Sequence, residues 1–183
     1  MFVLPLYASL PSVDQLKIFQ TFPRSVRKVV VATNIAEASV TINGISFVVD
    51  AGFVKTRYFN PNTGTDSLVI VPVSKASAQQ RAGRAGRNKH GYAFRLYPES
   101  EYENLQDFTP PEIERVALPS VILQLKALGI SNIVNFDFLS PPPEPNIVSA
   151  LDILYALQAI DDNGSLTDLL GLQMAEFPLS PAF

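Results

Sequence analysis

Short apolar runs separated by polar turns organise the first part of the chain. Lys28–Ala32 and Ile45–Asp50 have strand length and are rich in β-branched residues, which is typical of strands covered on both faces. A short helix is predicted over Asp14–Phe19, and residues 34–39 between the two strands predict another. Buried strands joined by short helical crossovers predict an α/β fold with a parallel sheet.

After the second strand, apolar positions begin to alternate with polar ones. Phe53–Phe59 alternates, Asn60–Gly64 is composed of residues that favour turns, and Leu68–Val71 has the composition of a returning strand. This pattern predicts a long β-hairpin. Ser77–Arg87 then predicts a helix, and Tyr92–Tyr97 predicts a further strand.

From residue 98 onward, helical periodicity and prolines replace the strand pattern. Glu112–Leu128 contains a helix that ends before Gly129, the residue type favoured just past a helix C-terminus. The proline-rich residues 140–145 predict a stiff linker, and Asn146 is a candidate N-cap for the next helix. One face of that helix is apolar and consists of Ile147, Leu151, Leu154 and Tyr155.

The last part of the chain adds a small turn and a further element. Residues 162–165, Asp-Asn-Gly-Ser, have the composition of a hairpin turn, and the strand-like residues 166–169 follow them. Two helices followed by a small hairpin predict a winged helix. Gly171–Phe183 then begins a further apolar element that Pro178 and Pro181 interrupt.

Composition excludes several kinds of chemistry. The chain of 183 residues has no Cys, so it holds neither disulfides nor thiolate metal ligands. Its one histidine, His90, gives little support to a Ser-His-Asp triad or a multi-histidine metal site. No apolar run reaches the roughly 18–20 residues of a membrane span, and Met1–Tyr7 lacks the basic start of a signal peptide. We expect neither a membrane segment nor a signal peptide.

Charge divides the chain into two modules. Residues 1–97 carry 12 Lys or Arg against 4 Asp or Glu, a net charge of +8. Residues 98–183 carry 2 against 13, a net charge of −11. A basic module joined to an acidic one indicates that the first module binds a polyanion such as nucleic acid or nucleotide phosphate.

The most specific motif is Gln-Arg-Ala-Gly-Arg-Ala-Gly-Arg at residues 80–87. On a helix, Gln80, Arg84 and Arg87 are four and three residues apart and therefore share one face. The two glycines weaken a helix, so their presence indicates a close approach to the backbone. Arginine forks match phosphate oxygens, and an arginine that reaches a transferring γ-phosphate stabilises the charge that develops there. The motif therefore predicts a phosphate site.

A second polar segment follows the first predicted buried strand. Thr33 and Asn34 lie where that strand ends, which is where open α/β sheets place their ligands. Hydroxyl and backbone N–H groups there can hold a phosphate without reading a base. Thr and Asn are also common in ordinary loops, so this segment alone does not define a site.

Three segments occur in a characteristic order: Ala-Thr-Asn-Ile-Ala-Glu at 32–37, Val-Val-Asp-Ala-Gly-Phe-Val-Lys at 48–55, and the arginine motif at 80–87. Together they resemble motifs V, Va and VI of the DEAH-box family of ATP-dependent RNA helicases, and most of all its spliceosome-associated nuclear branch. The resemblance covers nearly the whole chain, because it continues through residues 92–97, 123–130, 138–143 and 174–181.

The resemblance implies a division into three parts. Residues 1–97 would form most of the second RecA-like domain, an α/β domain with a parallel sheet from which the hairpin protrudes. Residues 98–170 would form the winged helix, and residues 171–183 would begin the helical ratchet bundle. The chain has no Gly-x-x-x-x-Gly-Lys-Thr phosphate loop and no Asp-Glu-Ala-His motif. We therefore expect a piece of a helicase that is inactive alone, with the Mg²⁺ ligands in a first RecA-like domain upstream.

The resemblance also implies roles for individual residues. Gln80, Arg84 and Arg87 would contact ATP phosphates, the two arginines as the catalytic residues of this part. Ser39 would help to sense the nucleotide state, and Asn43 replaces the family's usual Asp near the ribose. The RNA backbone would meet Thr33 with its neighbour Asn34, and the hairpin would separate strands. We expect no metal ligand among these residues.

The implied partners are RNA bound through its backbone, ATP with Mg²⁺, the first RecA-like domain and a glycine-patch cofactor protein. The implied localisation is the nucleus and the implied process is pre-mRNA splicing. A non-catalytic fragment that binds RNA or a glycine-patch protein is an alternative from a different class. A DNA-directed helicase is a third reading, since backbone recognition does not separate RNA from DNA.

Overall fold

The computed structural model describes residues 1–23, 25–38, 41–87 and 90–181. The chain forms two compact units, each of which is built from two stretches of sequence. Unit 1 consists of Met1–Lys55 and Ile70–Thr109, and unit 2 consists of Thr56–Val69 and Pro110–Phe183.

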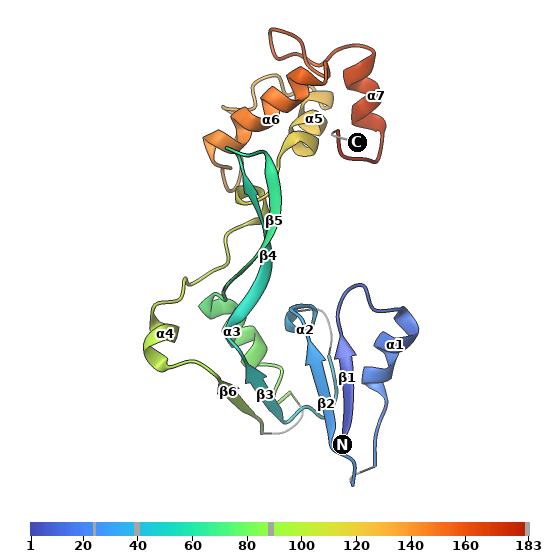
Figure 1. Cartoon of the computed structure of the whole chain (residues 1–183), viewed down its shortest axis with the longest axis vertical. Helices are drawn as coiled ribbons and strands as arrows, with labels where there is room; N and C mark the ends of the chain where they lie inside the picture. Colours follow the sequence, from blue (N-terminus) through green and yellow to red (C-terminus); the bar gives the residue numbers. More distant parts are fainter. Residues whose placement is uncertain (24, 39–40, 88–89, 182–183) are drawn as a thin grey trace. The chain divides into compact units, whose positions relative to one another are not determined.

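Unit 1 contains two pairs of parallel strands (Figure 1). One pair joins β1 (Phe2–Leu6) to β2 (Lys28–Ala32), and the other joins β3 (Phe47–Asp50) to β6 (Tyr92–Arg95). Because a parallel pair needs a crossover, helices lie between the strands in sequence. These helices are α1 (Ser12–Leu16), α2 (Ile35–Ala38) and α3 (Lys75–Ala82). A 3₁₀ turn extends α1 over Lys17–Phe19, and a further helix, α4 (Glu99–Glu103), follows β6. The predicted α/β class with parallel strands is confirmed.

Apolar side chains of unit 1 are buried on one side of its strands. Leu4 and Leu6 of β1 alternate with exposed residues and pack with Ile18 into a small core. The expectation of a strand covered on both faces is wrong for β3. Phe47 of β3 is 63% exposed and stacks at 5.8 Å on Tyr92 of β6, which is also exposed. Within the described ranges α3 packs on these strands, and it can cover one face of the pair only.

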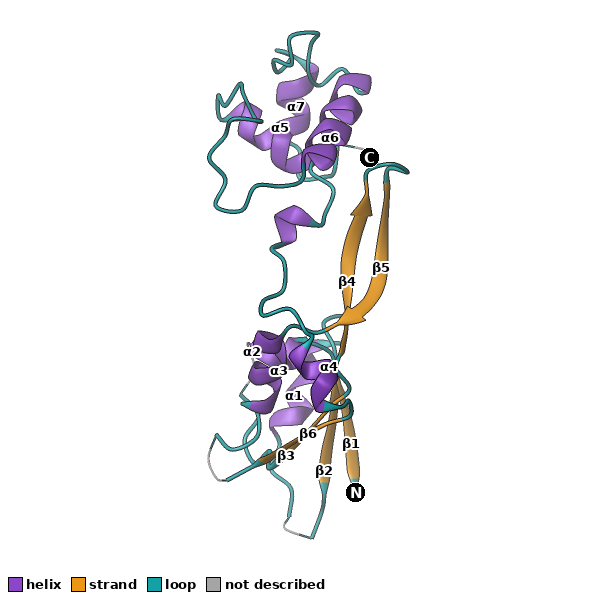
Figure 2. Ribbon diagram, turned by 90° about the vertical axis from the view of Figure 1, so that its left-hand side faces the viewer, coloured by secondary structure: helices purple, strands orange, loops and turns teal. Residues whose placement is uncertain are grey.

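The predicted hairpin is present as β4 (Phe53–Asn60) and β5 (Thr65–Pro72), which run side by side in opposite directions (Figures 1 and 2). The turn closes where Gly64, at φ +65°, donates its N–H to the Asn60 carbonyl at 2.9 Å. The outer part of the hairpin belongs to unit 2. There the buried Phe59 donates its N–H to the Arg115 carbonyl at 2.8 Å.

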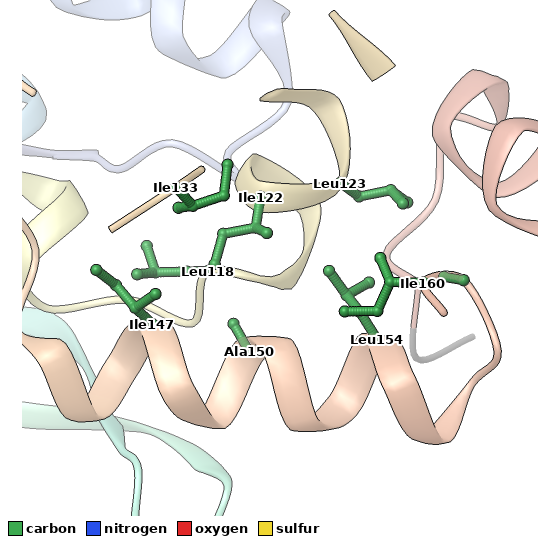
Figure 3. Packing of buried hydrophobic residues seen from close by; sticks show 9 residues of the cluster. Leu118, Ile122, Leu123, Ile133, Ile147, Ala150, Leu154 and Ile160 are labelled. Atoms are coloured by element: carbon green, nitrogen blue, oxygen red, sulfur yellow. The ribbon is translucent and has the colours of Figure 1, made fainter. Parts of the chain in front are cut away.

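Unit 2 contains three α-helices around one apolar core. They are α5 (Pro119–Ala127), α6 (Glu144–Ala156) and α7 (Leu170–Glu176), and a 3₁₀ turn over Glu112–Glu114 precedes them. Figure 3 shows side chains of α6 directed toward α5 and the segment that contains Ile133. The buried members of this core are Leu118, Ile122, Leu123, Ile133, Ile147, Ala150, Leu154, Ala159 and Ile160.

The sequence predicts the end of α5 correctly but misplaces the start of α6. Gly129 adopts φ +86°, and the following N–H of Ile130 reaches the Leu125 carbonyl at 3.1 Å, which closes α5 as expected. Asn146 is not the N-cap of α6, because the helix begins at Glu144 and Asn146 is buried in its first turn. Pro145 favours this earlier start, since its fixed φ suits the first helical turn and needs no N–H partner there.

Tyr155 also departs from the prediction for α6. Ile147 and Leu154 are buried in the core as expected, whereas Tyr155 is 54% exposed. Its hydroxyl donates to Asp162 at 2.8 Å, so the ring lies at the edge of the core and the phenol reaches the following turn. The apolar stripe of α6 is therefore narrower than the sequence pattern indicates, and Ala150 completes it.

The predicted small hairpin of unit 2 is reduced to one bridge between Ile160 and Leu166. Its turn is fastened by Asp161, whose carboxylate accepts the N–H groups of Asn163 at 2.9 Å and Ser165 at 2.7 Å. The ammonium group of Lys126 in α5 donates to the Gly164 carbonyl, which joins the turn to the helix. Burial lowers the pKa of Lys126, and the nearby carboxylate of Asp161 opposes that effect.

Candidate functional site

The arginine motif lies partly on α3 and partly on the turns that follow it. Ser74 caps the helix by accepting the N–H of Ser77 at 3.1 Å. The prediction of one helix over Ser77–Arg87 is wrong, because α3 ends at Ala82 and Gly83 is its C-cap. Arg84 and Arg87 therefore stand on turns and not on a continuous helical face with Gln80.

Glycine explains why the helix does not extend through the rest of the motif. Gly86 adopts φ +88°, a left-handed conformation that side chains disfavour. A Cβ on Gly91 would lie 2.5 Å from the backbone nitrogen of Gly86, so the chain itself approaches this turn closely. Together with Ala85 and His90, these glycines line an open hollow of about 390 Å³ beside the motif.

Arg81, which was not predicted as a site residue from the sequence, makes several contacts within unit 1. Its Nε donates to Glu37 Oε1 at 2.8 Å, and its Nη1 donates to Asp50 Oδ1 at 2.7 Å. The side chains of Arg81, Glu37 and Asp50 are 15%, 13% and 3% exposed. Burial lowers the pKa of Arg81, but the hydrogen bonds and charges of Asp50 and Glu37 outweigh it and leave the pKa raised.

Charge composition carries the signal that could have revealed this cluster. Residues 1–97 contain only four carboxylates, and two of them, Glu37 and Asp50, lie at or just beyond the ends of the predicted buried strands. A carboxylate at a buried strand end needs a cation, because an unpaired buried charge is strongly destabilising. Arg81 of the arginine motif meets that need.

Helix α3 and the arginine motif also contact the segment after β2. Ser77 donates its hydroxyl to Glu37 Oε2 at 3.3 Å, and Arg87 donates from Nη1 to the Thr41 hydroxyl. These pairs are 40 and 46 residues apart in sequence. The structure therefore brings the two segments that were singled out from the sequence to one place.

Arg84 lies close enough to Arg87 for the charge of Arg87 to act on its guanidinium group. Arg87 is exposed, and Arg84 is partly buried with its Nε 3.4 Å from the Gln80 carbonyl. Burial lowers the pKa of Arg84, and the positive charge of Arg87 lowers it further. An anion placed between such groups would relieve their repulsion, so this turn is suited to phosphate.

The other selected residues lie around this place. Thr33 and Asn34 follow β2 directly, are exposed, and lead into α2, which carries Glu37. Gln80 is exposed on α3, and Asn43 is exposed in the loop that follows Thr41. Ser39 lies outside the described residues.

The described part of the chain also limits other kinds of site. Its described ranges contain no group of three or more His, Cys, Asp or Glu side chains arranged to hold a metal ion. Among the same residues, no helix combines the length and the apolar character that crossing a bilayer requires.

Two protein-family models match the chain. Residues 1–89 match the helicase conserved C-terminal domain, and residues 150–179 match the winged-helix helicase associated domain HA2. The first match contains all the residues of the site described above except His90 and Gly91. The second match covers part of α6, the small turn and α7.

Relatives extend the similarity over almost the whole chain. The human probable ATP-dependent RNA helicase DHX35 is 56% identical over 181 residues, which are 99% of this chain and 26% of that protein. The pre-mRNA-splicing factor ATP-dependent RNA helicase prp22 of Schizosaccharomyces pombe is 53% identical over 98% of this chain and 15% of that protein. The crystal structure of the Escherichia coli DEAH/RHA helicase HrpB superposes with a TM-score of 0.91 at 37% identity, over 98% of this chain and 23% of that one.

The fold and the matched domains define a helicase C-terminal region, with a RecA-like part and a winged-helix part. Over almost its whole length the chain is similar to RNA helicases of the DEAH-box type, and the resemblance found in the sequence is confirmed. It spans about a quarter of the length of its human relative.

Proposed function

We propose that this chain is the C-terminal helicase region of an enzyme that couples ATP hydrolysis to the movement or remodelling of RNA. The relatives that match it over almost its whole length are named ATP-dependent RNA helicases. The observation that carries the proposal is the joining of the motif V segment to motif VI through Arg81–Glu37 and Arg87–Thr41. Below, the intact helicase means the longer protein that carries this region.

In the proposed ATP site, this region supplies the arginine side. Gln80, Arg84 and Arg87 bind the phosphates, and the two arginines stabilise the negative charge that develops during hydrolysis. Their donor groups fit phosphate, because guanidinium forks match its oxygens in number and geometry. Asn43 stands near the ribose, where its amide donates and accepts hydrogen bonds without a charge. The proposed role of Ser39 is to sense the nucleotide state.

The remaining parts of the ATP site come from the first RecA-like domain. That domain supplies the phosphate loop and the ligands of Mg²⁺, and the bound Mg²⁺ neutralises charge on the phosphates. The described residues of this chain supply donors for phosphate oxygens, whereas carboxylate clusters suited to Mg²⁺ are lacking among them.

The proposed RNA path runs along the carboxyl end of β2. Thr33 and Asn34 contact phosphate and sugar there, which gives affinity without base specificity. The net charge of +8 over residues 1–97 favours a polyanion at this surface. The hairpin of β4 and β5 separates the strands of an RNA duplex. In this proposal residues 1–97 form the RecA-like part, residues 98–170 the winged helix, and residues 171–183 the start of the ratchet part.

The cellular setting belongs to the same proposal. Similarity to the splicing factor prp22 supports a role in pre-mRNA splicing and a location in the nucleus. The winged-helix and RecA-like parts are the surfaces on which a glycine-patch cofactor protein would bind.

ATP hydrolysis tests the proposal. We expect the intact helicase to hydrolyse ATP with stimulation by single-stranded RNA, and the isolated chain of 20.0 kDa to show no hydrolysis. Phosphate release, measured on both proteins with and without RNA, checks this. Stoichiometric turnover by the isolated chain would contradict the division of the site between two domains. RNA binding by an intact protein that never hydrolyses ATP would favour the non-catalytic alternative.

A further inference from the structure

The partly buried ion-pair cluster of unit 1 joins segments that the proposed function treats as separate. We call Arg81, Glu37 and Asp50, with the carbonyl of Phe53, the Arg81 clasp. Arg81 Nη2 lies 2.6 Å from Glu37 Oε1, and its Nη1 donates both to Asp50 at 2.7 Å and to the Phe53 carbonyl at 3.2 Å. One guanidinium therefore contacts α2, the end of β3 and the first residue of β4 from its own place on α3.

The carboxylates of the clasp have further partners that fix their orientation. Asp50 also accepts the backbone N–H of Gly52 at 3.0 Å and the Tyr97 hydroxyl at 3.4 Å. Glu37 also accepts the hydroxyl of Ser77. A buried ion pair adds little net stability over an apolar packing, but one whose groups are all partnered admits a single arrangement of the segments that it joins.

The positions of the clasp residues in the sequence give this arrangement a consequence. Arg81 precedes the two arginines proposed to bind phosphate by three and six residues, and Glu37 follows Thr33 after four residues. Phe53, whose carbonyl accepts from Arg81, begins the strand β4 of the hairpin. The clasp thus joins the segment that is proposed to bind the nucleotide to the segment that is proposed to bind RNA. It also joins both to the start of β4, the root of the hairpin.

We propose that Arg81 is a positioning residue that couples the nucleotide-binding turn of this region to the segments that meet RNA. It contacts neither ATP nor RNA and acts through Glu37, Asp50 and the root of β4. The inference rests on the proposed function. Lysine cannot replace arginine here, because its single ammonium group lacks the planar fork that reaches three acceptors at once.

The test uses the intact helicase with Arg81→Lys and, as a second variant, Glu37→Gln, which keeps the size of the side chain. We measure the KM for ATP, the RNA-stimulated turnover, and the number of RNA duplexes separated per ATP hydrolysed. In both variants we expect an unchanged KM for ATP and a drop of about tenfold in duplexes separated per ATP, a size usual for coupling between sites. Gln79→Ala, an exposed position of the same helix, is the matched control and keeps the wild-type ratio.

Two results would overturn the inference in ways that can be told apart. If both variants lose turnover and strand separation in proportion, with a lower melting temperature, the clasp only holds the fold together. If they match the wild type in all three measurements, the clasp couples nothing. A wild-type helicase without ATP hydrolysis would instead refute the proposed function, and the inference with it.

Discussion

Replacing Arg87 by alanine in the intact helicase is expected to reduce ATP turnover by ~10³-fold or more, the loss usual for an arginine at a transferring phosphate. Binding of single-stranded RNA is expected to stay at the wild-type level. Phosphate release in the presence of RNA measures the first effect, and fluorescence anisotropy of labelled RNA measures the second.

The structure gives the physical reason for this separation of effects. Arg87 is exposed on a turn and its guanidinium contacts the hydroxyl of Thr41, so its removal creates no cavity in the core. Burial and the positive charge of Arg87 both lower the pKa of Arg84, so the two guanidinium groups lie close enough to interact. Thr33 and Asn34, the proposed RNA contacts, are untouched by the substitution.

Arg27→Ala is the matched control, because it removes an exposed arginine from the same unit. It is expected to leave ATP turnover within the range of the wild type. An Arg87→Ala enzyme that hydrolyses ATP normally but no longer binds RNA would reverse the assignment of the two sites.

Leu154→Ala is expected to destabilise unit 2 by about 2–5 kcal/mol, the range for deleting a fully buried leucine side chain. Leu154 is 0% exposed and lies in the core between α5, α6 and the segment before α7 (Figure 3). Alanine is the best helix former, so the loss comes from the lost packing and the cavity and not from the helix itself.

Urea unfolding of the chain, followed by far-ultraviolet circular dichroism, measures this loss. Val148→Ala on the same helix is the control, since Val148 is half exposed and its truncation should cost under about 1 kcal/mol. Equal stability of the Leu154→Ala and Val148→Ala variants would show that the apolar face of α6 is not the centre of the core.

Elements whose signal is local were predictable from the sequence. The β-branched runs give β2 and β3, the turn residues between alternating segments give the hairpin, and Gly129 gives the end of α5. Each of these signals depends on the backbone preference of single residues or on a short repeat of apolar positions. Neither requires a contact between residues that are distant in sequence.

The predictions from sequence are wrong where contacts between distant residues, or competing local preferences, determine where a helix begins or ends. A helical period through the arginine motif ignores that Gly86 adopts a left-handed turn against Gly91, so no helix runs through to Arg87. Asn146 is a good N-cap in isolation, but the prolines before it start α6 sooner.

The candidate site shows the same division. The arginines that we propose as phosphate ligands were recognisable because their spacing with glycine forms a motif. The Arg81 clasp was not recognisable from the sequence. Glu37 and Asp50 lie 44 and 31 residues away from Arg81 and pair with it only in the folded chain. Residue types that could have formed the pair were visible in the sequence, but their proximity was not.

Strand separation by the intact helicase tests the central claim most directly. The substrate is an RNA duplex with a single-stranded overhang, one strand is labelled, and the reaction is started with ATP or with a non-hydrolysable analogue. The account predicts strand separation with ATP, none with the analogue, and none with ATP for Arg87→Ala. Equal strand release with ATP and with the analogue would contradict it, because the protein would then open RNA by binding alone.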